Sequence, residues 1–599
     1  MNDTTHLASA VTSQVDLKSL SAEWLKRFEA LLCAGNTTAL ASLFAPECHY
    51  RDILAFSWTL RPSTGAQAIA EFLTNAQKKI QAKSFCLASE RAAPRKVRRV
   101  GIEVIEAIFK FETALGRGHG VIRLLAHQPD QAWVLLTTLD ELKGHEEKIG
   151  GNRPSGDAYS RNFGGANWLD QRIRERAFED RDPVVLIVGA GQNGLAVAAR
   201  LKQQEIDTLV VDKYPRIGDN WRVRYHSLAL HNQIHVNHLP YMPFPPTWPK
   251  YIPKDMLGNW LEMYAEAMQL NCWAGTEFTK GRYDDATKRW TVTLKRADGT
   301  ERVLHPRHVI FSNGTSGIAR VPKLPGLEDF AGDKFHSHGF KNGAPWRGKK
   351  ALVLGTGNSG HDIAQDLYSN QVDTTIIQRG STTVVSIDPS AKLNYALYEE
   401  GPSLEDCDLL ATATTYPLLI RAYQATVKRM VEYDKDLIAA LKARGFKYDL
   451  GEDETGHQMK YRRRGGGYYL DAGCSQLIID NEIGLLQFDD IEKFVPEGAL
   501  MKDGTLHKAD LLVLATGYYS QQEVVRRLMG DEVADRVGQV WGIATNGELA
   551  NMWTRTPQEG LWFMGGALAQ GRIYSLYVAL QIKALELGLI THDYQHDLN

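Results

Sequence analysis

Apolar residues recur first at helical spacing and then at strand spacing within the first 150 residues of this chain. Trp24, Phe28, Leu31 and Leu32 fall on one face of a helix, and further helical patterns occupy ALASLF and GAQAIAEFLTNAQKKI. Alternation of apolar and polar residues then predicts strands. Helices followed by an antiparallel sheet predict an α+β domain over residues 1–150. The predicted strands lie in VRRVGIEVIEAIFKFETA, GHGVIRLLAH and QAWVLLTTLDEL.

The pattern changes after residues 151–182, a polar and glycine-rich stretch that we interpret as a linker. A short apolar strand at 184–188 leads into a helix and then into a second strand, DTLVVDK. The same order of strand and helix returns in KKALVLGTGNSGHDIAQDL. Alternating strands and helices predict parallel sheets, so this part belongs to the α/β class. A chain of 599 residues needs more than one core.

Both strand–helix junctions carry a glycine-rich loop with GxGxxG spacing. Glycines at this spacing permit a tight turn and let backbone N–H groups approach a pyrophosphate, which the helix N-terminus attracts. We therefore predict two Rossmann-like dinucleotide-binding domains in one chain. The loop residues are Gly189, Gly191 and Gly194 in the first, and Gly355, Gly357, Asn358, Ser359 and Gly360 in the second.

The residues that end the second strand of each unit differ. Asp212 stands about 20 residues past the first loop, where an acid holds adenosine ribose hydroxyls, and Lys213 follows it. The second unit has no carboxylate there but has Arg379, which suits the 2′-phosphate of NADP because a guanidinium binds phosphate bidentately. A solvated surface arginine is the alternative. Gln378 beside it leaves the use of NADH open.

Composition narrows the classes of partner. The net charge of −2 provides no global field for nucleic acid or an anionic membrane. The six cysteines form no CxxC pair and no metal-ligand spacing, which predicts free thiols in a reducing compartment and no metal site. We see neither a secretory signal nor an apolar segment of about 20 residues, the length that a membrane span needs. The expected location is the cytoplasm.

Several motifs follow one another in the order of a known family. Phe330, Gly332, His336 and Phe340 fit FxGxxxHxxxF, which resembles the fingerprint of flavin-containing monooxygenases. Baeyer–Villiger monooxygenases, which are related, usually end that motif in Trp, where this chain has Phe340. Four further segments continue the resemblance over about residues 183–590. They are GDNW with Gly218 and Trp221, the YUCCA-like YHSLALHNQIHVNHLPYMPFP, LATGY with Thr516 and Gly517, and GLWFMGGALAQGRIYSLYVALQIKAL with Gln570.

The resemblance implies a division of the chain. An FAD-binding domain would comprise 183–344 and 510–599, the LATGY strand returning the chain to it. An NAD(P)-binding domain would cover 345–509, with a helical insertion at 388–464. Within the insertion, Arg462, Arg463 and Arg464 suit either NADP phosphates or a solvated loop. The segment LFAPECHYRDILAFSWTLRPSTGAQAIAEFL makes 1–150 similar to SnoaL-like domains, and such an extension marks type II flavin-containing monooxygenases.

The resemblance also implies an activity. Members use FAD, NADPH and O2, and oxygen adds at flavin C4a to make a (hydro)peroxide that oxygenates a small organic substrate. We expect ketones, by Baeyer–Villiger insertion, or soft nitrogen or sulfur atoms. Asn232 aligns with an asparagine that contacts flavin and nicotinamide in some members, with a structural amide as the alternative. For His336 the resemblance implies a role in linking the two cofactor domains.

Three alternatives remain open. One is YUCCA-like oxidative decarboxylation of a 2-oxo acid such as indole-3-pyruvate. Another is an uncoupled NAD(P)H oxidase, whereas the absence of a cysteine pair disfavours a disulfide reductase. A third hypothesis makes the chain a regulatory flavoprotein whose N-terminal domain is an interaction module, and a homodimer is compatible with each of these.

Overall fold

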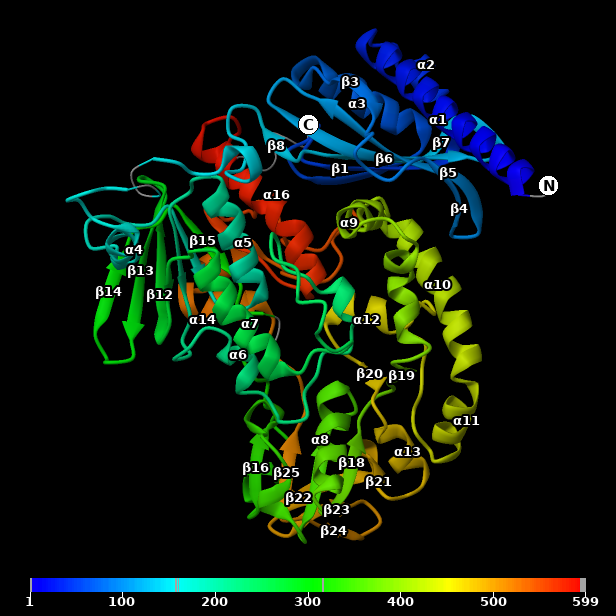
Figure 1. Cartoon of the computed structure of the whole chain (residues 1–599). Coiled ribbons are helices and arrows are strands. Elements are labelled where there is room, and N and C mark those ends of the chain that lie inside the picture. Colours follow the sequence, from blue (N-terminus) through cyan, green and yellow to red (C-terminus); the bar gives the residue numbers. More distant parts are fainter. Residues whose placement is uncertain (1–2, 157–158, 160, 315–316, 593–599) are drawn as a thin grey trace.

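The computed structural model describes residues 3–156, 159, 161–314 and 317–592, and Figure 1 shows how its parts are arranged. The N-terminal part is an eight-stranded sheet in the order β2-β1-β7-β6-β5-β3, with β4 on β5 and β8 on β6. The strands are β1 (Phe44–Ile53), β2 (Leu60–Thr64), β3 (Lys83–Leu87), β4 (Arg95–Arg99), β5 (Ile102–Glu112), β6 (Gly116–Leu125), β7 (Gln128–Thr138) and β8 (Glu141–Leu142); the helices are α1 (Asp3–Cys33), α2 (Thr37–Ala41) and α3 (Ala66–Ile80).

This part is α+β, but its sheet is not the purely antiparallel one that we predicted. Strand β1 precedes α3 in the chain and pairs in parallel with β7. From Cys48 to Ile53 every residue of β1 is buried, so the strand lacks the alternation by which a sequence search finds strands. The predicted first helix is present, with Trp24 and Phe28 buried and their rings stacked.

A parallel five-stranded sheet, in the order β11-β10-β9-β15-β26, carries the first glycine loop. Helices α5 and α16 pack against each other beside it (Figure 1). The strands are β9 (Val185–Val188), β10 (Thr208–Val211), β11 (Cys272–Trp273), β15 (His308–Phe311) and β26 (Leu561–Phe563), the helices are α4 (Trp168–Ala177), α5 (Gln192–Gln203), α6 (Asp219–Arg222), α7 (Lys254–Ala267) and α16 (Leu568–Glu586), and β12 (Thr276–Asp284), β13 (Arg289–Arg296) and β14 (Glu301–Leu304) form an antiparallel sheet.

A second parallel sheet, in the order β16-β25-β17-β18-β21, carries the second loop. Its strands are β16 (Asp333–His336), β17 (Lys350–Leu354), β18 (Asp373–Gln378), β21 (Gly484–Gln487) and β25 (Leu511–Leu514), with α8 (Asn358–Ser369) and α13 (Cys474–Ile479) packed on it. Beside it lie the antiparallel β22 (Ile491–Val495), β23 (Gly498–Met501) and β24 (Leu506–Lys508), and later helices α14 (Gln521–Met529) and α15 (Asp531–Val537) follow in the chain.

The prediction that the LATGY strand returns the chain to the first sheet is wrong. That strand is β25, and it pairs with β16 and β17 inside the second sheet. β16, which the predicted division places with the FAD-binding part, belongs to the second sheet too. Four buried apolar residues fit either sheet equally well, so the partner strands rather than the local sequence decide the placement.

Helices of the predicted insertion run beside the second sheet, where α11 packs on α13, and reach the N-terminal sheet, where α9 contacts β6 (Figure 1). Within the predicted helical insertion, α10 and α11 are separated at Asp434, whose carboxylate accepts hydrogen bonds from the N–H and hydroxyl of Ser386. The elements are α9 (Leu404–Thr412), α10 (Tyr416–Tyr433), α11 (Lys435–Ala443) and α12 (Gly456–Arg464), with β19 (Thr383–Ser386) paired to β20 (Tyr468–Asp471). Among the described residues, no helix is long and apolar enough to cross a membrane.

Candidate functional site

Two glycines of the first loop are required by the backbone itself. Gly189 has φ +105°, and its N–H donates to the carbonyl of Val211 at 2.8 Å. A Cβ on Gly194 would lie 2.0 Å from the carbonyl oxygen of Gly189. Side chains at either position would force the strand and the helix apart, so these glycines let β9 turn sharply into α5.

Gly191 has no such reason to be glycine. Its φ of −80° suits any residue, and a Cβ would meet only the side-chain nitrogen of Asn220, at 3.1 Å. It stands directly before α5, whose N-terminus has no side-chain cap. Nearby, the side-chain oxygens of Asn220, Ser312 and Asn313 are buried without a hydrogen-bond partner in the described chain. An open cradle at a bare helix N-terminus fits the pyrophosphate of a dinucleotide.

Asp212 stands where the ribose-binding acid is expected. Its carboxylate accepts the N–H of Ala190 at 2.8 Å and that of Tyr214 at 2.9 Å, which orient it at the end of β10. Burial raises the pKa of Asp212, although these hydrogen bonds oppose the rise. Each oxygen keeps a lone pair for a ribose hydroxyl. Lys213 is exposed beside it.

The other residues predicted to bind the first cofactor make their contacts mainly within the protein. Gly218 has φ +87° and packs against α7, since its Cβ would lie 2.0 Å from the carbonyl oxygen of Gly258. Trp221 donates its indole N–H to the side-chain oxygen of Gln192, at the first turn of α5. Gln570 accepts the N–H of Ala567 and so caps α16.

The N-terminal ends of α5 and α16 meet. The side-chain amide of Asn193 donates to the carbonyl of Gly566 at 2.9 Å. Gly571 packs on Asn193, whose side-chain oxygen would lie 2.4 Å from a Cβ on that glycine. Two helix N-termini at one place give a positive potential that favours an anionic group.

The second loop repeats the geometry of the first. Gly355 has φ +119°, and a Cβ on Gly360 would lie 1.9 Å from the carbonyl oxygen of Gly355. Gly357, with φ −83°, faces open space, its nearest neighbour being the carbonyl oxygen of Tyr468 at 3.7 Å from a Cβ. The same cradle therefore exists at the start of α8. Asn358 holds β20 by accepting the N–H of Leu470 at 2.8 Å, and Ser359 is partly accessible in the first turn.

At the end of β18, the two predicted residues differ in availability. Arg379 is exposed, and no hydrogen bond or ion pair to another described residue holds its guanidinium. Gln378 is wholly buried, and its amide exchanges two hydrogen bonds with the backbone of Lys447, at 2.9 and 2.7 Å. The Gln378 amide therefore anchors the chain at Lys447, and of the two residues only Arg379 stays accessible.

His336 ends β16 and is held between two backbone groups. Its Nε2–H donates to the carbonyl of Gly517 at 2.9 Å, and its Nδ1 accepts the N–H of His338 at 3.1 Å. Desolvation lowers the pKa of His336 below its ordinary value, so the ring is neutral. A histidine with both nitrogens engaged has no free base, and it ties β16 to the segment after β25. In that segment the Thr516 hydroxyl donates to the carbonyl of Arg320 at 2.6 Å.

Asn232 lies in a polar cluster that joins three parts of the chain. Its side chain and that of Gln458 lie beside the hydroxyl of Tyr395; burial raises the pKa of that hydroxyl to about 12. His231 retains accessible surface, and yet desolvation lowers its pKa to about 4. Close by, desolvation and the charge of His231 lower the pKa of His457 to about 3.

Arg462 reaches the same cluster. It is partly buried in the last turn of α12, and its Nε donates to the hydroxyl of Tyr423 at 3.2 Å. Burial works against its charge, but Tyr423, Tyr574 and Tyr461 outweigh that effect and raise the pKa of Arg462. In the described part of the chain no carboxylate pairs with it. Its neighbours differ: Arg463 pairs with Asp453 at 2.6 Å and Arg464 with Glu452 at 3.5 Å.

A contact that the sequence did not reveal joins the two sheets. Tyr225, which follows α6, donates its hydroxyl to Asp362 of α8 at 2.5 Å. No motif distinguishes either residue, because the pair forms only when the two parts of the chain pack together. The pair therefore holds together the two parts of the chain that carry the glycine loops.

The Tyr225–Asp362 pair predicts a pH effect. Burial raises the pKa of Asp362 to about 6, although the Tyr225 hydroxyl opposes the rise. The folded state thus holds this proton more firmly than the unfolded state, so the carboxyl's contribution to stability is present near pH 4 and is lost as pH rises through 6. Asp362→Asn should remove that loss. We expect the melting temperature of the variant, relative to the unmodified chain, to increase between about pH 4 and 7; a constant difference over that range would contradict the assignment.

Comparison with known proteins agrees with this geometry. A family model described as FMO-like, flavin-binding monooxygenase-like, matches residues 183–399. The indole-3-pyruvate monooxygenase YUCCA1 of Oryza sativa subsp. japonica is 28% identical over 354 residues, 59% of this chain and 80% of the relative. The probable indole-3-pyruvate monooxygenase YUCCA9 of Arabidopsis thaliana is 32% identical over 337 residues, 56% of this chain and 75% of the relative.

Among solved structures, a complex of OTEMO with FAD and NADP superimposes with a TM-score of 0.50 and 16% sequence identity, over 70% of this chain and 87% of that chain. This likeness shows the fold. Two open glycine cradles on joined parallel sheets define an oxidoreductase with two dinucleotide sites, one for FAD and one for NADPH. The chain belongs to the flavin-containing monooxygenase family, which is FAD- and NADPH-dependent.

Proposed function

We propose that this chain uses NADPH and O2 to oxygenate small ketones, or soft nitrogen or sulfur atoms. The observation that carries the proposal is the pair of open cradles at Gly191 and Gly357, one at each helix N-terminus, on sheets joined by Tyr225 and Asp362. When bound, the dinucleotides supply hydride transfer and oxygen activation, which no side chain offers.

The chain's own residues bind and orient. Gly191 and the start of α5 would hold the FAD pyrophosphate, and Asp212 the adenosine ribose. Gly357 and Arg379 would hold NADPH, with Arg379 at its 2′-phosphate. The polar cluster around Asn232 would line the reacting end, where the side-chain amide of Asn232 can donate a hydrogen bond without giving up a proton. His336, through the carbonyl of Gly517, would fix the chain where it leaves the second sheet after β25.

Arg462 favours a second candidate activity. A partly buried guanidinium that faces tyrosines, with no carboxylate paired to it among the residues that the structure describes, suits an anionic substrate, because an unpaired buried charge is costly. The substrate named for the rice relative, indole-3-pyruvate, carries such a carboxylate beside an aromatic ring. Oxidative decarboxylation of a 2-oxo acid is therefore the alternative that we propose to test.

For the N-terminal sheet and its helices, a SnoaL-like fold is our proposal. The support is the α+β arrangement in which helices α1 to α3 pack against one strongly curved, mixed sheet (Figure 1).

One experiment separates the two activities. The purified FAD-loaded chain is supplied with NADPH, O2 and a panel of ketones, sulfides and aromatic 2-oxo acids, and products are identified by mass spectrometry. Oxygenated ketone or sulfide supports the first activity, and decarboxylated acid supports the second. If the chain oxidises NADPH and releases only peroxide with every compound, it is an oxidase and both proposals fail.

Arg462→Met sharpens this test. We expect the KM of a 2-oxo acid to rise about 30-fold, which corresponds to loss of a charge-assisted hydrogen bond of about 2 kcal/mol, while a neutral ketone changes little. Arg464→Met is the matched control, since Arg464 already pairs with Glu452. Equal losses for acid and ketone would contradict a carboxylate site.

Arg379→Ala tests the choice of nicotinamide. Without the guanidinium, the KM for NADPH should rise about tenfold or more while that for NADH stays nearly constant, because only NADPH has the 2′-phosphate. Steady-state oxidation of each coenzyme at saturating O2 measures this. Equal losses for both coenzymes would make Arg379 a surface residue without this role.

A further inference from the structure

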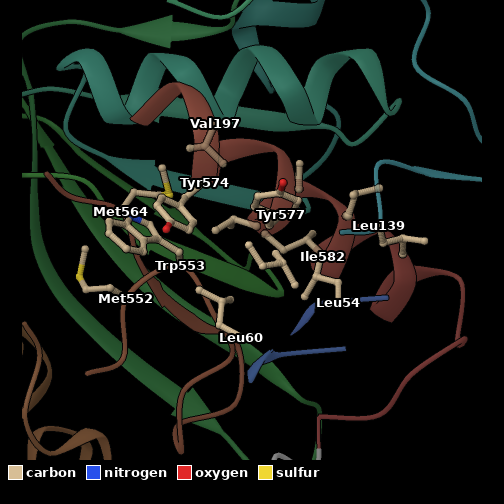
Figure 2. Packing of buried hydrophobic residues seen from close by; sticks show 14 of the residues in the cluster. Leu54, Leu60, Leu139, Val197, Met552, Trp553, Met564, Tyr574, Tyr577 and Ile582 are labelled. Carbon is tan, nitrogen blue, oxygen red and sulfur yellow. The ribbon is translucent and has the colours of Figure 1, made fainter. Parts of the chain in front are cut away.

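The N-terminal domain shares a hydrophobic core with helix α16. In Figure 2, Leu54, which follows β1, and Leu60 of β2 lie near Trp553 and Tyr577, which belong to the C-terminal part of the chain. All of them fall in one continuous cluster of buried residues. A module on a flexible linker would not pack in this way. The shared core holds the N-terminal domain in a fixed position against α16.

Arg51 of β1 adds hydrogen bonds to this interface. Its Nε and one terminal nitrogen donate to the two carboxylate oxygens of Glu548, both at 2.7 Å. Its other terminal nitrogen donates to the carbonyl of Thr412, at the end of α9, at 2.9 Å. The side chain is 7% exposed. Burial opposes its charge, but Glu548 outweighs that effect and raises the pKa of Arg51.

The same guanidinium holds Tyr574 of α16. The nitrogen that bonds Glu548 also donates to the Tyr574 hydroxyl at 3.1 Å. Tyr574 stacks on Trp553, with ring centroids 3.9 Å apart and planes 3° apart. The indole N–H of Trp553 donates in turn to the carbonyl of Gly565, next to the loop that opens α16. Tyr461, which precedes Arg462 in α12, donates its hydroxyl to Gln570 in the first turn of α16 at 3.4 Å, and Tyr574 helps to raise the pKa of the Arg462 guanidinium.

We infer that Arg51 is a positioning residue for the substrate site. Through the Tyr574 hydroxyl, the N-terminal domain sets the place of the first turns of α16 and of the Arg462 guanidinium. Arg51 touches neither substrate nor cofactor. The inference rests on the proposed function, in that it takes the cluster around Asn232 and Arg462 as the substrate site.

Arg51 and Tyr574 should therefore act as one unit. Arg51→Met removes the fork, and Tyr574→Phe removes only the hydroxyl while keeping the stack on Trp553. We expect each to raise the substrate KM and the substrate Kd about tenfold, and to increase the peroxide released per NADPH, since small displacements of reacting groups uncouple such reactions. FAD content should not change. In a double-mutant cycle, the combined variant should be no worse than Arg51→Met alone.

Further variants separate positioning from folding. Arg51→Met leaves the Glu548 carboxylate without its partner, so the melting temperature should fall. Tyr574→Phe keeps the Arg51–Glu548 pair, so its melting temperature should equal that of the unmodified chain. Arg51→Lys keeps the charge but not the bidentate fork, so it should restore stability more than coupling. Arg91→Gln is the matched control: it breaks the 3.0 Å ion pair with Asp406 between the same domain and α9 without touching α16.

Substrate Kd, followed through the visible flavin spectrum, gives a readout besides turnover. Additive effects of Arg51→Met and Tyr574→Phe on this Kd, or an equal rise in Arg91→Gln, would overturn the positioning role. These results are distinct from failure of the proposed function, in which the unmodified chain forms no product from any compound of the panel.

Discussion

Replacing Gly191 with valine is expected to give a folded protein that no longer retains FAD. The backbone at Gly191 has φ −80°, which valine adopts readily, and only the side chain of Asn220 stands within 4 Å of the new Cβ. The added methyl groups would instead fill the space at the start of α5 where the pyrophosphate needs backbone N–H groups. We expect FAD affinity to fall about 100-fold or more, since several charge-assisted hydrogen bonds are lost together.

Visible absorption of the purified protein measures bound FAD, and circular dichroism reports its fold. Gly194→Ala is the contrasting variant: its Cβ would lie 2.0 Å from the Gly189 carbonyl oxygen, so it should lower the melting temperature as well as FAD content. A Gly191→Val protein that carries one FAD per chain would show that the first loop is not the FAD cradle.

Gly357→Val should separate the two cofactors in the opposite sense. Gly357 has φ −83°, and a Cβ there has no neighbour closer than 3.7 Å, so the protein itself tolerates valine. The side chain would occupy the second cradle, at the start of α8. We expect a yellow protein with normal FAD content in which NADPH reduces the flavin about 100-fold more slowly at a given NADPH concentration.

Anaerobic stopped-flow mixing with NADPH measures this rate, and dithionite should still reduce the flavin fully. Gly360→Ala is the control for packing damage, because its Cβ would lie 1.9 Å from the Gly355 carbonyl oxygen. If Gly357→Val is reduced by NADPH at the normal rate, the second loop does not bind the nicotinamide coenzyme.

Arg51 changes how the N-terminal domain is understood. A regulatory interaction module would present a free surface and would leave the site intact when removed. Here the domain's own arginine holds α9, Glu548 and α16 together, and its core continues into theirs. The structure therefore favours a domain that helps to build the site.

Local sequence was sufficient for the cofactor cradles. A glycine that needs φ above +100°, such as Gly189 or Gly355, and an acid such as Asp212 at a strand end follow from backbone sterics and short-range hydrogen bonding within one strand–helix unit. Both loops, Asp212 and the exposed Arg379 are placed as the motifs predicted. Their contacts with the cofactors stay predictions.

Interactions between distant segments required the tertiary structure. The apolar β25 fits either parallel sheet, and only its partners β16 and β17 place it in the second. The sequence alone left Gln378 available for a nucleotide. In the folded chain its amide is hydrogen-bonded to the backbone of Lys447, far along the chain.

The sequence by itself therefore determined the chemistry of each strand–helix unit, because a few neighbouring residues decide it. It was enough to predict two dinucleotide cradles and the family. Only the tertiary structure decided which residues form the proposed substrate site. Asn232, Tyr395, Arg462 and Tyr574 come from separate segments, and they meet because three parts of the chain bury apolar surface against one another.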